Sequence, residues 1–330
     1  MTHLGLGRYT VGIAAALAMF AGCGGTQPPI GAPGGPSSAL AHKEQSLLYI
    51  SDEQASDVYM VALPSGKLVG KLTGFNYASG DCTDEHGNVF VGNLTEGQVR
   101  GYAHGAKSAF RVLNDPSWWP ESCSVDPTTG NLAVCNIRTN QSLGSIAVYR
   151  NAKGTAHYYQ YSNVINFWYC AYDSDGDLFA DAINYGSGGG DSPILFELPN
   201  GSKTMRPVSL SPAFTGDASP PLFWDGKYLA VATPDAGFIY QYKISGNTGT
   251  RVNVVKLDGA SKVLGPFWIA SDGSGQTLYA PVAKGSVESV GVYGYPSGGK
   301  RLQNLYDAPL PFAAAVSAPN NAASSKEKDR

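Results

Sequence analysis

Apolar and polar positions alternate along the chain from Ser46 onward, in runs of four to eight residues. These runs are rich in Val, Ile, Tyr and Phe, and they are separated by Gly, Asn, Asp and Pro. A period of two is typical of β-strands with one buried face, whereas no long stretch has the period of about 3.6 residues expected of an amphipathic helix. The sequence therefore predicts an all-β fold with essentially no helix.

One phrase recurs along the chain: a short strand, an Asp-led turn with a glycine, and a second apolar strand. Its copies are GDCTDEHGNVFVGN from Gly80, ESCSVDPTTGNLAVCN from Glu121, WYCAYDSDGDLFADA from Trp168, LFWDGKYLAVAT from Leu222 and FWIASDGSGQTLYAP from Phe267. The turn glycines (Gly87, Gly130, Gly176, Gly226 and Gly275) are 43, 46, 50 and 49 residues apart. A repeat of about 40 to 50 residues that carries four short strands indicates a β-propeller.

The two ends of this region together supply one further repeat. The first full repeat predicts strands at residues 79–83, 89–92, 98–103 and 109–113, from innermost to outermost, whereas residues 47–72 match only the second, third and fourth strands. The segment PFAAAVSAP at 311–319 has the pattern of the missing innermost strand. We therefore expect a six-bladed β-propeller over residues 46–319, with blade 1 closed by pairing of the N- and C-terminal strands, because this pairing removes an exposed strand edge.

The N-terminal segment has the features of an export signal. Arg8 precedes an apolar run from Val11 to Phe20 that is too short to span a bilayer, so residues 1–22 are predicted to be a signal peptide. Ala-Gly-Cys at 21–23 resembles a bacterial lipobox, which implies lipidation of Cys23. Residues 23–45 would then be a lipidated, Pro/Gly/Ser-rich flexible linker. A plain secretory signal with an incidental cysteine is the alternative.

These features predict a lipid-anchored protein of the bacterial cell envelope. Gly24 stands where an inner-membrane retention rule favours aspartate, so the outer membrane is expected rather than the inner one. The polar C-terminal residues 320–330 are predicted to be a disordered tail. Charged residues make up 15% of the chain and the formal net charge is −3, so no basic face is expected for nucleic acid, and membrane contact is expected through the anchor only.

The segment Val125 to Asn136, VDPTTGNLAVCN, resembles the inner-hairpin repeat of NHL and YVTN-like β-propellers. The resemblance covers nearly all of residues 46–319 and implies the fold. Propellers of this kind include lactonases, lyases, ligand-binding proteins and scaffolds, so the resemblance does not select one function.

Asp81 and Glu121 are the only carboxylates at the start of a predicted innermost strand, near the mouth of the central channel. The fold resembles that of gluconolactonase-type enzymes, which implies a divalent ion held at this place by acidic and amide side chains. The matching positions in later repeats are aromatic, proline or leucine residues, so the later repeats supply no further metal ligand beside these two carboxylates. The histidines are scattered, which gives little support to a chemistry like that of virginiamycin B lyase. We therefore predict no cofactor, no metal and no catalytic residue.

The aspartates that open the hairpin turns allow two interpretations (Asp84, Asp126, Asp173 and Asp272). Their carboxylates could bind calcium, or they could accept hydrogen bonds from backbone N–H groups of their own turns. The turn interpretation is favoured, because the aspartate recurs in copies that contain no other carboxylate.

All five tryptophans lie at or just before a predicted innermost strand. Packing between sheets is favoured for Trp168, Trp224 and Trp268, whereas ligand binding is favoured for the adjacent pair Trp118 and Trp119, because neighbouring strand residues face opposite ways. The predicted ligand-binding residues are Asp81, Trp118, Trp119, Glu121 and Trp168. Asp81, Trp118, Trp119 and Glu121 are expected on one rim, at the face of the outer-to-inner connections, where carboxylates and rings suit a sugar or a cation.

Four cysteines remain after Cys23: Cys82, Cys123, Cys135 and Cys170. Cys82, Cys123 and Cys170 align at the same repeat position, where equivalent side chains point the same way around the ring, so a bridge between them requires a place very near the axis. Cys123 and Cys135 would face each other only if their turn has five residues. Unpaired, buried cysteines are therefore the favoured interpretation.

Together these patterns predict an exported, membrane-tethered β-propeller that serves as a ligand-binding or protein-interaction scaffold. Its partner is an unknown small molecule, carbohydrate or protein. The alternative is a metal-dependent lactonase or lyase that uses the same channel mouth.

Overall fold

A computed structural model describes residues 44–116, 118–138, 143–184, 192–213, 219–233, 235–271, 273–284, 286–305 and 310–319. All of them belong to the second of two units into which the chain divides, residues 38–330. The predicted signal peptide, Cys23 and the C-terminal tail after Pro319 lie outside the described residues, as does the linker as far as residue 43. Within the described ranges, no helix has the length and apolar character needed to span a membrane.

The described part of the chain is all-β, as the alternation predicts, apart from two single-turn 3-10 helices at Leu94–Glu96 and Arg150–Ala152. Its first two sheets contain β25 (Pro311–Ser317), β1 (Leu47–Asp52), β2 (Asp57–Ala62) and β3 (Lys67–Leu72), and then β4 (Ala78–Thr83), β5 (Val89–Asn93), β6 (Gln98–Tyr102) and β7 (Arg111–Asn114), each paired in that order. The observed bounds of β4 to β7 differ from the predicted ones by two residues at most.

The remaining strands form four groups that pair antiparallel, consecutively except in the last group, whose short first strand pairs with the third strand. They are β8 (Trp118–Val125), β9 (Leu132–Arg138), β10 (Ser145–Tyr149) and β11 (His157–Tyr159); β12 (Asn166–Tyr172), β13 (Leu178–Asn184), β14 (Ser192–Leu198) and β15 (Arg206–Ser211); β16 (Leu222–Trp224), β17 (Leu229–Ala232), β18 (Phe238–Ser245) and β19 (Thr248–Asp258); and β20 (Lys262–Val263), β21 (Trp268–Ser271), β22 (Gln276–Lys284), β23 (Val287–Tyr295) and β24 (Gly298–Asn304). Short parallel pairings of β15 with β19 and of β19 with β24 join neighbouring groups at their outer strands.

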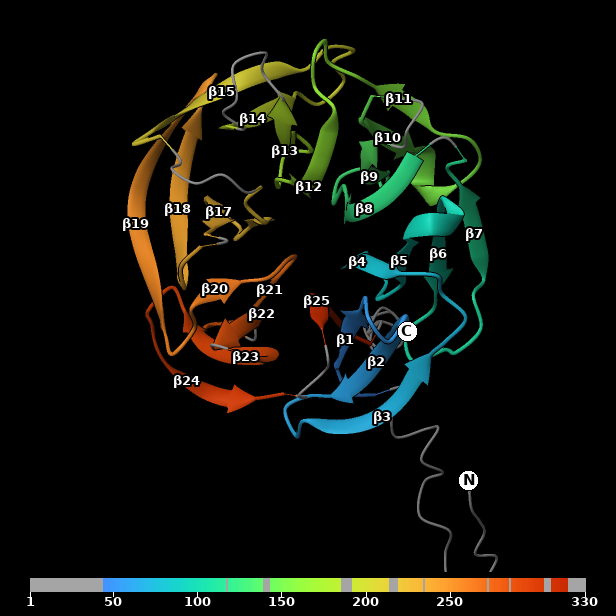
Figure 1. The fold of residues 1–330 in the computed structure, drawn as a ribbon, viewed down its shortest axis with the longest axis vertical. Helices are drawn as coiled ribbons and strands as arrows, with labels where there is room; N and C mark the ends of the chain where they lie inside the picture. The colour runs from blue at the N-terminus through green and yellow to red at the C-terminus, as the bar shows by residue number, and fades with distance from the viewer. Residues whose placement is uncertain are drawn as a thin grey trace, which may run out of the picture. The chain divides into compact units, whose positions relative to one another are not determined.

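The sheets lie side by side around a common centre, with β4, β8, β12, β21 and β25 nearest to it (Figure 1). Apolar side chains from facing sheets fill the space between them; Phe90 and Val99 of one sheet, for example, pack with Leu132 and Val134 of the next. Gly80 allows the inner strands to approach closely, because a Cβ atom there would lie 2.6 Å from the carbonyl oxygen of Glu121. Each sheet thus uses both faces for burial, which explains why every residue of β1, β5 and β25 is buried.

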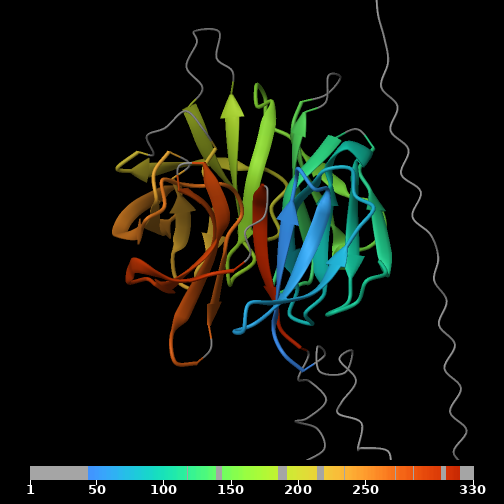
Figure 2. The ribbon, with the colours of Figure 1, turned by 60° about the horizontal axis from the view of Figure 1, so that its bottom comes forward.

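The two chain ends meet in one sheet. β1 pairs antiparallel with β25, from Leu47 opposite Ser317 to Asp52 opposite Pro311, and every residue of both strands is buried. Figure 2 shows β25 beside β1, running down to the lower face of that view. The hydroxyl of Ser317 donates a hydrogen bond of 2.6 Å to the carbonyl oxygen of Gly87, in the hairpin between β4 and β5. The end of β25 therefore marks the face on which the inner hairpins lie.

The hairpin aspartates confirm the turn interpretation. The Oδ1 atom of Asp84 accepts hydrogen bonds from the backbone N–H groups of His86 and Asn88, at 2.9 and 2.8 Å. Asp126 and Asp173 accept bonds from their own turns in the same way. The turn glycines have φ angles of 70 to 83° at Gly130 and Gly176, in the left-handed region that favours glycine. Asp272 lies outside the described residues.

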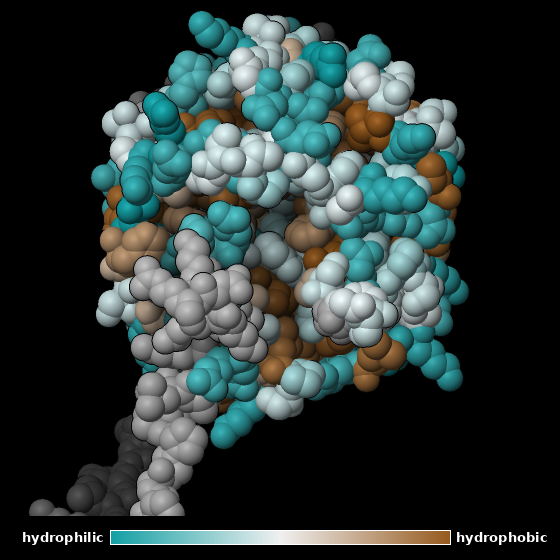
Figure 3. All heavy atoms as spheres, turned by 180° about the vertical axis from the view of Figure 1, so that it is seen from behind, coloured by the Kyte–Doolittle hydropathy of each residue, from teal (hydrophilic) through white to brown (hydrophobic). Residues whose placement is uncertain are grey.

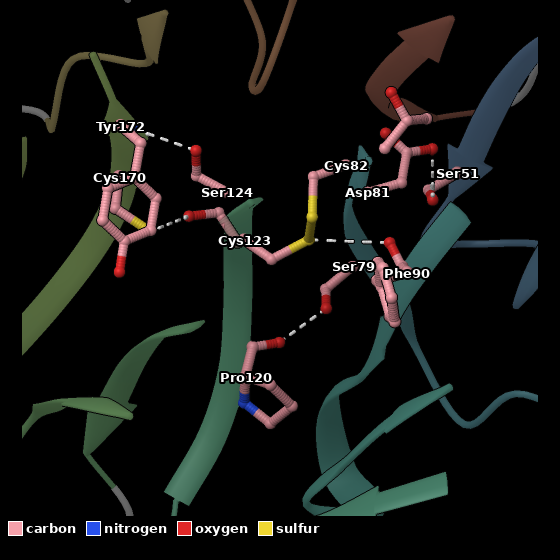
Figure 4. Close-up of a disulfide and its surroundings, with 12 residues drawn as sticks. Ser51, Ser79, Asp81, Cys82, Phe90, Pro120, Cys123, Ser124, Cys170 and Tyr172 are labelled. Carbon is pink, nitrogen blue, oxygen red and sulfur yellow. Dashed lines mark hydrogen bonds between the residues drawn. A yellow bond between two sulfur atoms is a disulfide. The ribbon is translucent and has the colours of Figure 1, made fainter. Parts of the chain in front are cut away.

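The cysteine prediction was wrong for one pair, because Cys82 and Cys123 form a disulfide between β4 and β8, with their Cα atoms 5.7 Å apart (Figure 4). Cys135 and Cys170 are unpaired and buried, as expected. Cys123 lies opposite Val134 and not opposite Cys135, so a bridge within the hairpin does not form.

The strand registers give the physical reason for this error. Cys82 pairs with Phe90 one step from the hairpin end of its ladder, whereas Cys123 pairs with Val134 two steps from it. The position equivalent to Cys123 in β4 is therefore Asp81, not Cys82. Because side chains alternate between the two faces of a strand, this offset of one residue turns Cys82 toward the next sheet and Cys123 back toward the preceding one.

We expect the pairing of β25 to carry much of the stability. Deleting residues 310–330 removes β25 and exposes the edge of β1, so the melting temperature should fall by more than about 10 °C. Deleting only residues 320–330 removes none of the described pairings and should change it by less than about 2 °C. Circular dichroism melts of the two truncated proteins make the comparison, and equal melting temperatures would contradict it.

Candidate functional site

Three adjoining cavities open at the hairpin ends of the inner strands. Their volumes are about 280, 590 and 290 Å³, and Thr83 and Trp268 line all three. We call this group of cavities the hairpin mouth. It lies on the face reached by the end of β25, and Figure 3, which presents that face, shows a hollow at its centre with apolar residues inside. β4, β8, β12, β16 and β21 all contribute side chains to the first cavity, so the mouth depends on the arrangement of several sheets.

Half-buried aromatic rings form one side of the hairpin mouth. Trp224 stacks on Phe179 with an interplanar angle of 12°, and its Nε1–H donates a hydrogen bond of 2.9 Å to the hydroxyl of Ser174. Trp268 packs edge-on against Phe223, with ring centroids 5.0 Å apart. Both indoles are therefore held in place while part of each ring remains accessible, an arrangement suited to anchoring an apolar or aromatic group.

The polar part of the rim comes from the inner turns. Asp84 and Glu85 line the second and third cavities, while Asp126 lines the third. The carboxylates of Asp84 and Asp126 are occupied by hydrogen bonds within their own turns. Glu85 is exposed, with its Oε1 3.7 Å from the Nε2 of the exposed His86, so its carboxylate is accessible to an approaching partner.

Sequence reasoning missed this site because it assigned Trp224 and Trp268 to the core. Trp224 directly precedes the turn residue Asp225, and the end of an inner strand is where a large side chain is only partly covered. The position of Trp224 beside a turn could therefore have been noticed in the sequence. The proximity of Trp268 to Thr83 could not, because it depends on contact between the ends of the described chain.

The predicted binding residues do not gather on one exposed rim. Trp119 is 37% exposed at the start of β8, at the opposite end of that strand from the hairpin. Trp118 is half-buried; its ring packs on Tyr158 at 4.4 Å, and its Nε1–H donates to the carbonyl oxygen of Leu143. Trp168 is half-buried, and its buried Nε1 has no hydrogen-bond partner among the described residues.

Asp81 and Glu121, in contrast to Trp119, are only 4% and 3% exposed. Asp81 points toward the sheet of β1, where its Oδ2 accepts a hydrogen bond of 3.1 Å from the hydroxyl of Ser51 (Figure 4). Burial raises the pKa of Asp81 to about 8, because the charged form loses its hydration. The expected carboxylate pair beside exposed indoles is therefore replaced by carboxyls inside the fold.

Glu121 belongs to an interior group of acids that the sequence did not indicate. Burial, with a smaller contribution from the charges of Glu53 and Asp181, raises its pKa to about 8. The pKa of Asp181 is also raised to about 8, mainly by burial, although its Oδ1 accepts a hydrogen bond from the backbone N–H of Tyr169. Glu53, between β1 and β2, has its pKa raised to about 7 by burial and by the charge of Asp52.

This acidic group does not fit the divalent ion implied by the gluconolactonase resemblance. Within the described ranges, no three His, Cys, Asp or Glu side chains are grouped so that they could hold a metal ion. Asp81, Glu121 and Asp181 are desolvated and largely protonated near neutral pH, whereas a hard cation requires several converging ionised oxygens.

Comparisons with known proteins show the fold and no function. No protein-family model and no curated protein matches the chain. Among solved structures, the chain is similar to one from a crystal structure of a nidogen/laminin complex, with a TM-score of 0.62 and 11% identity over 83% of this chain and 99% of that one. It is also similar to a protein of unknown function from Bacteroides caccae, with a TM-score of 0.60 and 12% identity over the same shares. The fold is thus β-propeller-like and all-β.

The buried acids predict that stability falls with rising pH. The carboxyls of Asp81, Glu121 and Asp181 keep their protons in the folded state up to about pH 8, whereas in the unfolded chain they ionise near about pH 4. Between these values the folded state binds more protons, so the free energy of unfolding decreases as the pH rises and is greatest below about pH 4 to 5 as far as these groups are concerned. We expect a higher melting temperature at pH 5 than at pH 8.

Glu121→Gln removes one of these titrating groups and should reduce the difference between the two pH values. Glu85→Gln, which changes an exposed carboxylate, is the matched control and should leave the difference as it is in the parent. Thermal melts at pH 5 and pH 8 measure the difference in melting temperature for the parent and for each variant. A parent protein that melts at the same temperature at both would disprove the assignment, as would equal effects of the two variants.

Proposed function

We propose that residues 46–319 form a six-bladed β-propeller that acts as a protein-binding module through its hairpin mouth. The consecutive groups of strands support six blades, with β25 completing the sheet of β1 to β3. The observation that carries the binding proposal is that the half-buried indoles of Trp224 and Trp268 line the same cavity.

The form of the mouth favours a protein over a small molecule. Binding energy in protein interfaces concentrates in a few aromatic anchors that are surrounded by a polar rim. Here the anchors are fixed by ring contacts, the rim is acidic, and three open cavities adjoin one another, which suits several side chains of one partner. A propeller-like chain of similar fold is also recorded in a nidogen/laminin complex, which supports the proposal at the level of fold.

A metal-dependent lactonase or lyase is not favoured by any observation. The two carboxyls proposed for it, Asp81 and Glu121, are buried with raised pKa values, and no metal-binding group occurs in the part of the chain that the structure describes. Their position instead supports a structural role inside the fold.

We also propose that the protein is exported and tethered by a lipid on Cys23, in the outer membrane of a bacterial envelope. The sequence pattern of residues 1–23 supports export, and the disulfide between Cys82 and Cys123 supports an oxidising compartment.

Photo-crosslinking tests the binding proposal. A photo-reactive amino acid in place of Glu85, on the rim, should give one discrete adduct with a partner protein in cells that produce the full chain. Trp268→Ala should reduce the yield at least about tenfold, because a truncated anchor costs on the order of 2 kcal/mol of binding. The readout is the shifted band on a denaturing gel, and mass spectrometry of that band names the partner.

Two controls make this test specific. The same photo-reactive residue at Val252, exposed on the outer strand β19, should give no such adduct. Trp119→Ala, which alters an exposed indole at the other end of β8, should leave the Glu85 adduct unchanged. Adducts that form equally from both positions, or that persist in Trp268→Ala while disappearing in Trp119→Ala, would assign binding to another surface.

Cys23→Ser should release the protein from the membrane fraction if lipidation provides the tether. Immunoblots of soluble and membrane fractions compare the variant with the parent, and Cys135→Ser serves as a control that changes a buried cysteine. A Cys23→Ser protein that stays in the membrane fraction to the same extent as the parent would exclude the anchor.

A further inference from the structure

Cys135 and Cys170 lie on neighbouring sheets and share one neighbour, Ser122. Cys135 in β9 is the residue directly opposite Ser122 of β8. Cys170 in β12 approaches the same serine from the other side, with its Sγ 3.9 Å from the serine Oγ. The two cysteines therefore converge on a single point between the sheets.

Both thiols lie in the apolar layer between these sheets. Burial raises the pKa of the Cys135 thiol, and hydrogen bonding with the Cys170 thiol raises it further. Both side chains belong to one cluster with Ala133, Phe167 and Ala180, and they are 0% and 5% exposed.

Cys170 occupies the same position in its ladder as the disulfide-bonded Cys123. Cys170 pairs with Ala180 two steps from the hairpin end of its ladder, which is the position that Cys123 occupies in β8. Both side chains therefore face the preceding sheet. Cys123 bonds there to Cys82 of the inner strand β4, while Cys170 meets Cys135 of the second strand β9. The side chains of Cys123 and Cys170 thus point in the same direction from their strands, and each lies near a cysteine of the preceding sheet.

We propose that Cys135 and Cys170 are a second disulfide site, which links β9 to β12 in the oxidised protein. The reaction is thiol–disulfide exchange with a disulfide compound of the glutathione class. One cysteine thiolate attacks the oxidant and expels a thiolate; the other cysteine then attacks the mixed disulfide and expels the second. The two cysteines lose two protons and two electrons, and the oxidant is reduced to two thiols.

The bond forms as the sheets come together during folding, because a buried thiol with a raised pKa supplies little thiolate afterward. With it, covalent links join three successive sheets through β4–β8 and β9–β12. Cys170 also lines the first cavity of the hairpin mouth, so the bond replaces a thiol in the wall of that cavity by a disulfide. The proposal stands independently of what the mouth binds.

Peptide mapping after oxidative refolding tests the site. The full chain carrying Cys23→Ser, which excludes an unrelated thiol, is reduced, unfolded and refolded with oxidised and reduced glutathione. It is then denatured, alkylated with iodoacetamide and cleaved after Lys and Arg and before Asp without reduction. These cuts separate the cysteines, since Cys135 falls in residues 126–138, Cys170 in 154–172 and Cys123 in 115–125.

We expect a crosslinked peptide that joins residues 126–138 to 154–172, together with the Cys82–Cys123 crosslink, and the loss of both alkylatable thiols. In the control Cys135→Ala, Cys170 should become alkylated while the Cys82–Cys123 crosslink remains. Alkyl groups on both Cys135 and Cys170 after refolding would overturn the proposal, as would a crosslink from either residue to Cys123 or Cys82.

Discussion

The pairing of β25 with β1 is the interaction on which the rest of the structure depends. The sheet that it completes contacts its neighbours on both sides: the Thr83 hydroxyl of β4 donates to the carbonyl oxygen of Val316, and the N–H of Ala314 donates to the carbonyl oxygen of Pro266, just before β21. Asp81 bonds to Ser51 in the same sheet. The hairpin mouth also requires β25, because residues from both ends of the described chain line its second cavity.

Local pattern sufficed to predict most of the fold. Strand alternation, the Asp-led turns and the missing inner strand at residues 47–72 are encoded within short segments, so they could be read without knowing the packing. The cysteine register was misaligned. Cys82 stands two residues before its turn aspartate, Asp84, whereas Cys123 stands three residues before Asp126, and the strand pairings keep this offset of one residue. One residue decides which face a side chain occupies, so a small misalignment reversed the interpretation.

The candidate site was less accessible to sequence reasoning for a related reason. Asp81 and Glu121 were placed on inner strands correctly, but whether a carboxyl is ionised depends on desolvation, which is a property of the assembled sheets. Glu53 lies outside the repeated phrase and Asp181 lies at the end of one copy, and both come near Glu121 only in three dimensions. Trp268 was assigned to packing, and it does pack on Phe223, yet its other side borders the mouth.

The register of β1 against β25 also determines how the protein responds to mechanical force. Leu47 lies opposite Ser317, so the two ends of the described chain leave the sheet at the same point and on the same face. Tension between them opens the ladder one pair at a time, as a zipper opens, instead of shearing all of its hydrogen bonds together. Beyond this pair the next inner strands, β4 and β8, are joined by a covalent bond. A pull on the ends would therefore unpeel the terminal strands first, and the disulfide would keep the chain between Cys82 and Cys123 from being extended.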